Sequence, residues 1–179
     1  VYIGDSIIIA CKVGVNWKTG NWSDNWPVTP GGNASGRPLL SVHNTHINYY
    51  QYGIYTDGVV SVHESDLLLY HNENGTQNGI ALAHGNGTEI FITDVESWGF
   101  NSNFYTDGVV FYENITYSSV SNARGVCAGA GAYRYVVENR TGCKNNFFRD
   151  ITRRLTGGSF ANNKTINALS GGLVDIGVR

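Results

Sequence analysis

Methionine is absent from this sequence of 179 residues, and proline and cysteine occur only three times each. No long window has the periodicity of an amphipathic helix, and no apolar run approaches the length of about 18 residues that a membrane-spanning helix needs. The cysteines do not follow a metal-binding spacing. We therefore expect no transmembrane segment, no bound metal and no resident cofactor.

A strongly basic composition is also missing, because the formal net charge is −2, and this argues against a nucleic-acid partner. The charge is nevertheless uneven. Residues 1–123 contain three bases and eleven acids, which gives −8, and residues 124–179 contain nine bases and three acids, which gives +6. In a solenoid this polarity favours head-to-tail self-association. The alternatives are a solvated basic face, or an acidic polysaccharide bound by Arg149, Arg153 and Arg154.

The sequence does contain 23 glycines and many short segments rich in Val, Ile, Thr, Tyr and Phe, which is typical of a chain that turns often between strands. The six residues Tyr55–Val60 recur unchanged at Tyr105–Val110, 50 positions later. Ser41–His43 returns as Ser61–His63 at an offset of 20. Together these repeats predict a unit of about 20 to 26 residues, within the range of solenoid repeats.

The predicted fold class is therefore all-β. A single parallel β-helix, which is a solenoid, is the favoured architecture, and an antiparallel β-sandwich of the jelly-roll type is the alternative. Residues 1–40 begin with one apolar strand and continue with a stretch rich in Gly, Asn, Pro and Trp, so we expect them to form a strand and cap segment. Residues 41–179 are expected to form the β-helical domain.

Two segments resemble a known family. Ile92–Phe100 and Ile115–Val126 each contain Ile-Thr followed later by a glycine and an apolar residue, a pattern that looks like the coils of pectin-lyase-like right-handed parallel β-helices. The resemblance covers roughly residues 40–179 and implies a right-handed winding. That family includes polysaccharide lyases and hydrolases, phage tailspikes, adhesins and carbohydrate-binding modules. None of its hydrolase motifs is intact here, so the resemblance implies a fold and no activity.

Asp57 and Asp107 are the candidate catalytic residues, because they occupy matched positions of the repeat. Two units apart on a β-helix, they would stand about 10 Å from each other on one face. That distance is near the upper limit for the carboxylates of an inverting glycosidase. The competing interpretation is a repeated Thr-Asp-Gly turn without catalysis. If the chain were a lyase, calcium would be its expected cofactor.

Asn-x-Ser/Thr sequons are more frequent than composition alone would produce. They predict N-linked glycans and therefore a secreted protein, or one on a cell or virion surface. The competing interpretation is that Asn and Thr are common in the turns of β-helices. The predicted glycosylation sites are Asn21, Asn33, Asn74, Asn86, Asn114, Asn139 and Asn163.

Cysteines and tryptophans supply the remaining candidates. Cys127 and Cys143 lie sixteen residues apart, so neighbouring coils could bring them together as a disulfide, which would leave Cys11 unpaired.

The N-terminal segment holds three closely spaced tryptophans, which could pack as part of the cap or form a platform for sugar rings. These are Trp17, Trp22 and Trp26.

Taken together, the residues predict an extracellular, N-glycosylated surface or filament-forming protein. Its role would be structural or adhesive, with carbohydrate binding and head-to-tail assembly. The alternative is a polysaccharide lyase or glycoside hydrolase that acts on an acidic polysaccharide. Catalysis is the less favoured interpretation, because no complete catalytic motif is present.

Overall fold

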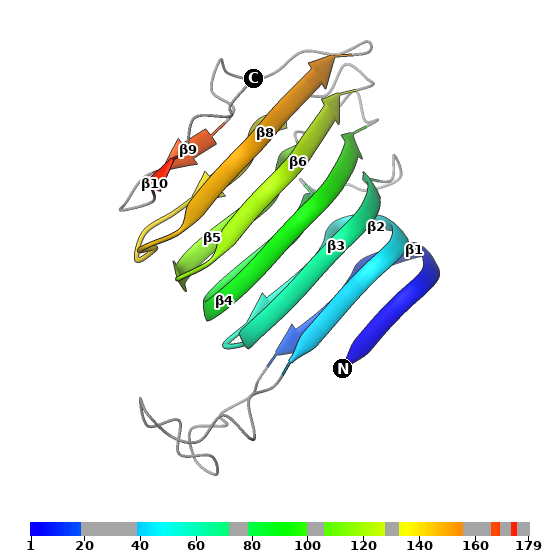
Figure 1. Ribbon diagram of the computed structural model, residues 1–179. Coiled ribbons are helices and arrows are strands. Elements are labelled where there is room, and N and C mark those ends of the chain that lie inside the picture. Colours follow the sequence, from blue (N-terminus) through cyan, green and yellow to red (C-terminus); the bar gives the residue numbers. More distant parts are fainter. Residues whose placement is uncertain are drawn as a thin grey trace.

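The computed structural model describes residues 1–18, 39–71, 79–99, 106–127, 133–155, 166–168 and 173–174, which form strands and no helix (Figure 1). The all-β prediction is therefore confirmed, and none of these ranges contains a helix that could span a membrane. The strands are β1 (Tyr2–Lys18), β2 (Leu40–Asp57), β3 (Val60–His71), β4 (Ile80–Gly99), β5 (Thr106–Thr116), β6 (Ser119–Cys127), β7 (Tyr133–Asn139), β8 (Phe147–Leu155), β9 (Ile166–Ala168) and β10 (Leu173–Val174).

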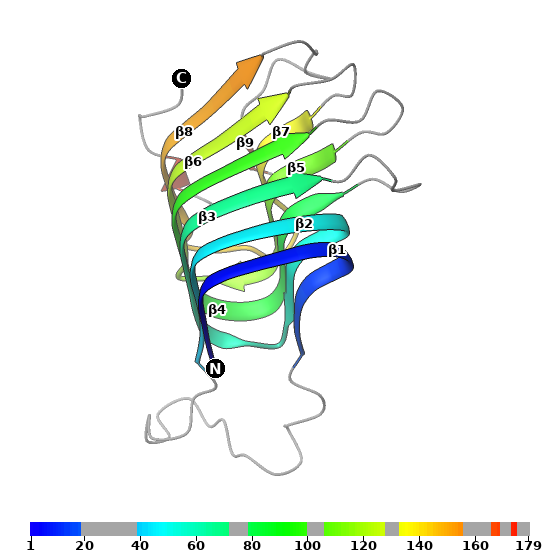
Figure 2. The ribbon, with the colours of Figure 1, turned by 90° about the vertical axis from the view of Figure 1, so that its right-hand side faces the viewer.

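All strand pairs in these ranges are parallel, so the alternative of an antiparallel sandwich is wrong. The long strands β1, β2 and β4 bend, and each contributes one part to each of two facing layers (Figure 2). The first sheet joins the N-terminal parts of β1 and β2 to β3, the C-terminal part of β4, β6, β8 and β10. The second sheet joins the remaining parts to β5, β7 and β9. Because β2, β3 and β4 all pair with one another, the pairing closes on itself.

Most coils return to the same position after 28 residues, which is the separation of Thr56 from His84 and of Thr93 from Ser121. In the same way, Val62 pairs with Ile90 in the first sheet. The predicted unit of about 20 to 26 residues is therefore too short for these coils. The match between Ser41 and Ser61 is also out of register, because Ser41 pairs with His63.

The coil between β2 and β3 is shorter than the one that follows it. Tyr49 lies beside His71, and Tyr52 lies beside Ile80. Tyr49 and Tyr52 are three residues apart in the sequence, whereas His71 and Ile80 are nine residues apart. The coil between β2 and β3 is therefore six residues shorter than the next one. An unequal coil of this kind shifts any fixed period that is read from the sequence.

The core lies between the two sheets and consists of columns of similar side chains. One column of the first sheet contains Val42, Ile92, Val120 and Phe148. A buried column of the second sheet contains Ile54, Leu82, Val110 and Val137. Burying one such aliphatic or aromatic side chain stabilises the fold by about 1.5–3 kcal/mol. Tyr49 and Tyr112 are also fully buried, and this burial raises the pKa of both hydroxyls.

Columns of residues with left-handed backbone mark the bends between strands. The column that follows the second sheet contains Gly58, Asn86, Asn114 and Gly142, with φ of 72°, 50°, 55° and 80°. A second bend column contains Ser61, Glu89, Tyr117 and Asn145, and a third contains Asp5, Asn44, Asp66, Asp94, Asn122 and Asp150. Gly, Asn and Asp tolerate this conformation best, which explains why they punctuate the sequence.

The N-terminal strand belongs to the same stack. β1 pairs in parallel with β2 from Tyr2 beside Ser41 to Lys18 beside Asp57. Residues 19–38 of the predicted cap segment lie outside the described ranges. Within the described part, the proposed boundary between residues 1–40 and 41–179 therefore separates two strands that are hydrogen-bonded to each other.

Candidate functional site

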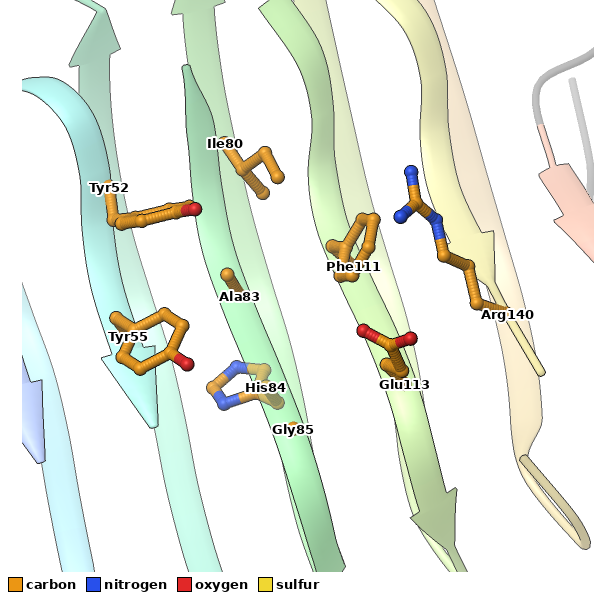
Figure 3. A pocket seen from close by; sticks show the side chains of 9 residues that line it. All are labelled: Tyr52, Tyr55, Ile80, Ala83, His84, Gly85, Phe111, Glu113 and Arg140. Carbon is orange, nitrogen blue, oxygen red and sulfur yellow. The ribbon is translucent and has the colours of Figure 1, made fainter. Parts of the chain in front are cut away.

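A groove of about 340 Å³ lies on the outer face of the second sheet, above β4 (Figure 3). Its floor is low because Ala83 and Gly85 carry almost no side chain. Parallel pairing fixes their neighbours: Ala83 lies between Tyr55 and Phe111, and Gly85 lies between Asp57 and the carboxylate-bearing residue of β5, Glu113. The groove is therefore one strand wide, with walls supplied by β2 and β5.

Aromatic side chains form the two walls. The ring centroids of Tyr52 and Tyr55 lie 5.1 Å apart on the β2 side, and Phe111 stands on the β5 side, as Figure 3 shows. Strands that are two positions apart in a sheet are separated by about 9.6 Å. A saturated ring in contact with both walls needs about 4 Å on each face, or about 8 Å in all. The walls therefore leave room for one ring of this kind.

Each wall also contacts a cation from the next strand outward. Lys18 Nζ of β1 lies 4.9 Å from the ring centroid of Tyr55. Arg140 Cζ, just beyond β7, lies 4.0 Å from the centroid of Phe111, and its Nε donates to Glu138 Oε1 at 3.1 Å. These cation–π contacts hold the two rings in place. In each case the cation approaches the ring from the side away from β4.

Two carboxylates flank the glycine of the groove floor. Asp57 and Glu113 stand on opposite sides of Gly85. Burial raises the pKa of the Tyr55 hydroxyl, and the charge of Asp57, then Tyr52 and then Glu113 raises it further. The carboxylates of Asp57 and Glu113 disfavour the tyrosinate anion.

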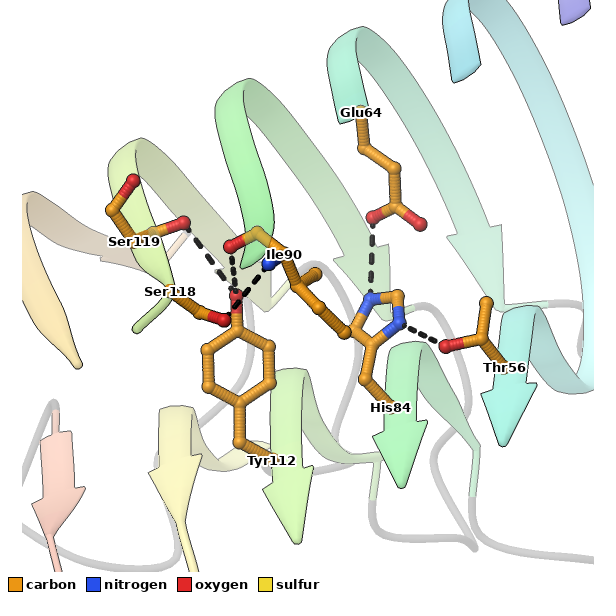
Figure 4. A network of polar contacts seen from close by, with 7 residues as sticks. All are labelled: Thr56, Glu64, His84, Ile90, Tyr112, Ser118 and Ser119. Carbon is orange, nitrogen blue, oxygen red and sulfur yellow. Dashed lines mark hydrogen bonds and ion pairs between the residues drawn. The ribbon is translucent and has the colours of Figure 1, made fainter. Parts of the chain in front are cut away.

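Beneath the groove, a chain of polar contacts crosses the core (Figure 4). Thr56 Oγ1 and His84 Nδ1 lie 2.7 Å apart. His84 Nε2 lies 3.3 Å from Glu64 Oε2, which is within ion-pair distance when the imidazole is protonated, although the pair does not meet hydrogen-bond geometry. All three residues are at most 1% exposed.

Thr56, His84 and Glu64 present a hydroxyl, an imidazole and a carboxylate in this order. A catalytic triad has the same order of nucleophile, base and orienting group. Thr56 nevertheless has no exposed surface, so a substrate could not reach its hydroxyl. The arrangement therefore connects the two sheets rather than forming a catalytic triad. Tyr112 lies beside His84 on the next strand of the second sheet. Its hydroxyl donates to the carbonyl of Ile90 at 3.3 Å, as Figure 4 also shows.

The predicted catalytic pair does not occupy matched positions. Asp57 is in register with Gly85 and Glu113, whereas Gly108 is in register with Ile80 and Tyr52. Asp107, the neighbour of Gly108, therefore lies six positions from the place that corresponds to Asp57. The reason is that two coils of this part of the stack are longer than the fifty positions of the sequence repeat.

The predicted sugar-binding residues are distributed over distant parts of the stack. Trp17 is in register with Thr56, packs against the core, and has a buried Nε1, so it is not an exposed platform. Trp22 and Trp26 lie outside the described residues. The arginines all lie on β8 of the first sheet, where Arg149 Nε is 3.5 Å from Asp150 Oδ2, and they do not line the groove. The remaining arginines of this set are Arg153 and Arg154.

Two of the predicted glycosylation sites are exposed and share one bend column. Asn114 Nδ2 donates to Asn86 Oδ1 at 2.9 Å, and Asn86 Nδ2 donates to Asp57 Oδ1 at 2.8 Å. Asn139 is fully buried and accepts a hydrogen bond from Asn146 Nδ2 at 3.0 Å, which does not fit the exposed turn that a glycan requires. The other sequons lie outside the described residues, at Asn21, Asn33, Asn74 and Asn163.

The predicted disulfide between Cys127 and Cys143 is absent. Cys143 is buried and is not in a disulfide, and Ile115 N donates to its Sγ at 3.5 Å. Burial raises the pKa of this thiol. Cys143 lies 28 residues after Ile115 and follows the second sheet, whereas Cys127 ends β6 in the first sheet. A sixteen-residue spacing therefore does not bring the two into equivalent positions of adjacent coils.

Metal-binding clusters of three or more His, Cys, Asp or Glu side chains do not occur in the ranges given above. The groove was missed at the sequence level because its residues are not adjacent in the chain. Tyr55, Ala83 and Phe111 follow one another at the same spacing as Asn86 and Asn114, which are 28 residues apart. A search at the true coil length would have shown a small residue between two aromatic ones.

Comparison with known proteins adds no relative to this picture. No family model matches the chain, no curated protein matches it, and no solved structure matches it. The resemblance to pectin-lyase-like helices therefore stays a prediction from sequence, and the geometry of the groove is the basis for assigning a function.

Proposed function

We propose that this protein is an extracellular surface or adhesion protein that binds a carbohydrate chain in the groove above β4. The groove is the observation that supports this function. It combines aromatic walls, a floor without side chains and polar groups at its edge, which is the combination that small-molecule sites use to hold and orient a ligand.

A sugar ring suits this geometry because it has apolar C–H faces and a polar rim. Its faces would pack against Tyr55 and Phe111, and its hydroxyls would donate to Asp57 and Glu113. The groove is open along the sheet and runs between strands, so neighbouring units of a polymer could continue beyond it. Binding rather than cleavage is favoured, because the two predicted catalytic aspartates are out of register.

We also propose the finer features of the fold and its setting. Equal offsets of 28 residues in the second sheet, between Thr56 and His84, and in the first, between Thr93 and Ser121, support a parallel β-helix. The resemblance to pectin-lyase-like coils supports a right-handed winding. The exposed sequons at Asn86 and Asn114 support N-linked glycans and a secreted, cell-surface or virion-surface location. The unequal charge of the two halves supports head-to-tail self-association.

Binding to a panel of neutral, acidic and amino polysaccharides, measured by calorimetry, tests the proposed function. Phe111→Ala should weaken binding by about tenfold, because it removes one wall of the groove. Ala83→Leu should abolish binding, because it fills the floor. Phe91→Ala is the matched control, since Phe91 is an exposed phenylalanine of the first sheet. Equal loss in this control, or no binding to any sugar, would contradict the proposal.

A further inference from the structure

Glu113 is the least compensated charge in the groove. It is exposed on β5, and no hydrogen bond or ion pair reaches its carboxylate from any described residue. Arg140 lines the same groove, but its Nε is paired with Glu138, and Figure 3 shows its guanidinium pointing away from Glu113. The carboxylate of Glu113 is therefore available to a ligand.

The aromatic walls, like the Glu113 carboxylate, favour a positively charged ligand. Aromatic faces attract cations, and each wall ring already contacts one cation of the protein, Lys18 on Tyr55 and Arg140 on Phe111. Lys18 comes from β1 and Arg140 lines the groove from beyond β7, whereas Glu113 lines the groove and Asp57 stands across Gly85 from it. A positively charged group in the groove would meet aromatic faces and carboxylates together.

We propose that the groove selects an amino sugar with a free ammonium group, and that Glu113 is the residue that selects it. This inference rests on the proposed carbohydrate function and names its substrate class. The ammonium group would pair with the Glu113 carboxylate while the sugar ring packs between Tyr55 and Phe111. An acidic polysaccharide would place its carboxylates beside Asp57 and Glu113, where like charges repel.

A pair of probes that differ only in charge tests this inference: a glucosamine hexamer and its fully N-acetylated counterpart. The native protein should bind the free amine about fivefold more tightly, the gain expected for one exposed ion pair. Glu113→Gln should equalise the two affinities, and Glu113→Lys should shift the preference to a polyuronate. High salt should reduce the preference for the amine, because the ion pair is exposed.

Glu96→Gln is the matched control, because Glu96 is a partly exposed glutamate of the first sheet that pairs with Arg124. It should leave the preference for the amine unchanged. Equal binding of both hexamers by the native protein, or a preference unaffected by Glu113→Gln, would overturn this inference and leave carbohydrate binding intact. Failure to bind either hexamer or any other sugar would instead overturn the proposed function itself.

Discussion

At the scale of single residues, Glu64 is a buried carboxylate in an otherwise apolar column of the first sheet. It occupies the column of Val42 and Ile92 in the first sheet, and its Oε2 lies 3.3 Å from His84 Nε2 of the second sheet. Burying a carboxylate costs several kcal/mol unless it is paired. The Glu64–His84 contact therefore matters more for stability than an ion pair on the surface would.

Substituting Glu64 and substituting His84 should lower the free energy of unfolding by unequal amounts. His84→Phe leaves the Glu64 carboxylate buried without a partner and should destabilise the protein by about 3–5 kcal/mol. Glu64→Ile leaves an imidazole that can stay neutral and should cost less, about 1–3 kcal/mol. Urea unfolding of both variants, followed by circular dichroism, measures the difference.

The double variant Glu64→Ile/His84→Phe is the control for this pair. It removes both polar groups and continues the aliphatic column, so it should recover most of the stability that His84→Phe loses. Additive losses in the double variant would show that the two side chains do not interact.

At the scale of elements, the bend columns decide where each strand ends. Gly58, Asn86, Asn114 and Gly142 adopt the same left-handed backbone in successive coils. The amides of Asn86 and Asn114 are hydrogen-bonded to each other, so the bend is held between coils as well as within one. Position 142 also favours glycine for space, because a Cβ there would overlap Asn114 Oδ1.

Gly142→Ala should therefore destabilise the protein by about 1–3 kcal/mol, since it combines a positive φ with a steric clash. The measurement is the shift of the urea midpoint at unchanged slope.

Asn114→Gly provides the matched background for this substitution. It removes the side chain that a Cβ at position 142 would meet, so Gly142→Ala should cost less in Asn114→Gly than in the native protein. The same cost in both backgrounds would show that the backbone conformation, and not the clash, accounts for the effect.

At the scale of the whole molecule, the stack has an open edge. β1 pairs only with β2 in the described ranges, so its outer edge carries unpaired backbone groups. Ile7 and Ile9 on this strand are 73% and 62% exposed. An exposed apolar edge strand is a template for pairing with another chain, and the unequal charge of the two halves favours a second copy.

We therefore expect the native protein to self-associate at low ionic strength and to dissociate as salt screens the opposite charges. Ile7→Lys/Ile9→Lys should give a monomer under both conditions, because lysines on an edge strand oppose pairing. Light scattering coupled to size exclusion measures the mass. Phe91→Lys, on an inner strand, should leave association unchanged, and a native protein that stays monomeric at every salt concentration would rule out the model of head-to-tail assembly.

Much of the local structure could be predicted from the sequence. The short segments rich in Val, Ile, Thr, Tyr and Phe are strands, and Gly, Asn and Asp residues occupy their bends. The alternation of Val60, Val62 and Glu64 even places Glu64 on the inward side. These features follow from short-range sterics, which a few neighbouring residues are enough to fix.

Only the tertiary structure decided which coils lie side by side. The register depends on the loop lengths and on which inward side chains fill the core, and most coils have 28 residues, which is longer than the predicted period. Asp57 therefore lies beside Gly85 and not in register with Asp107, and Cys143 is not in a disulfide. The groove has the same origin, because Tyr55, Ala83 and Phe111 become neighbours only when the coils stack in the observed register.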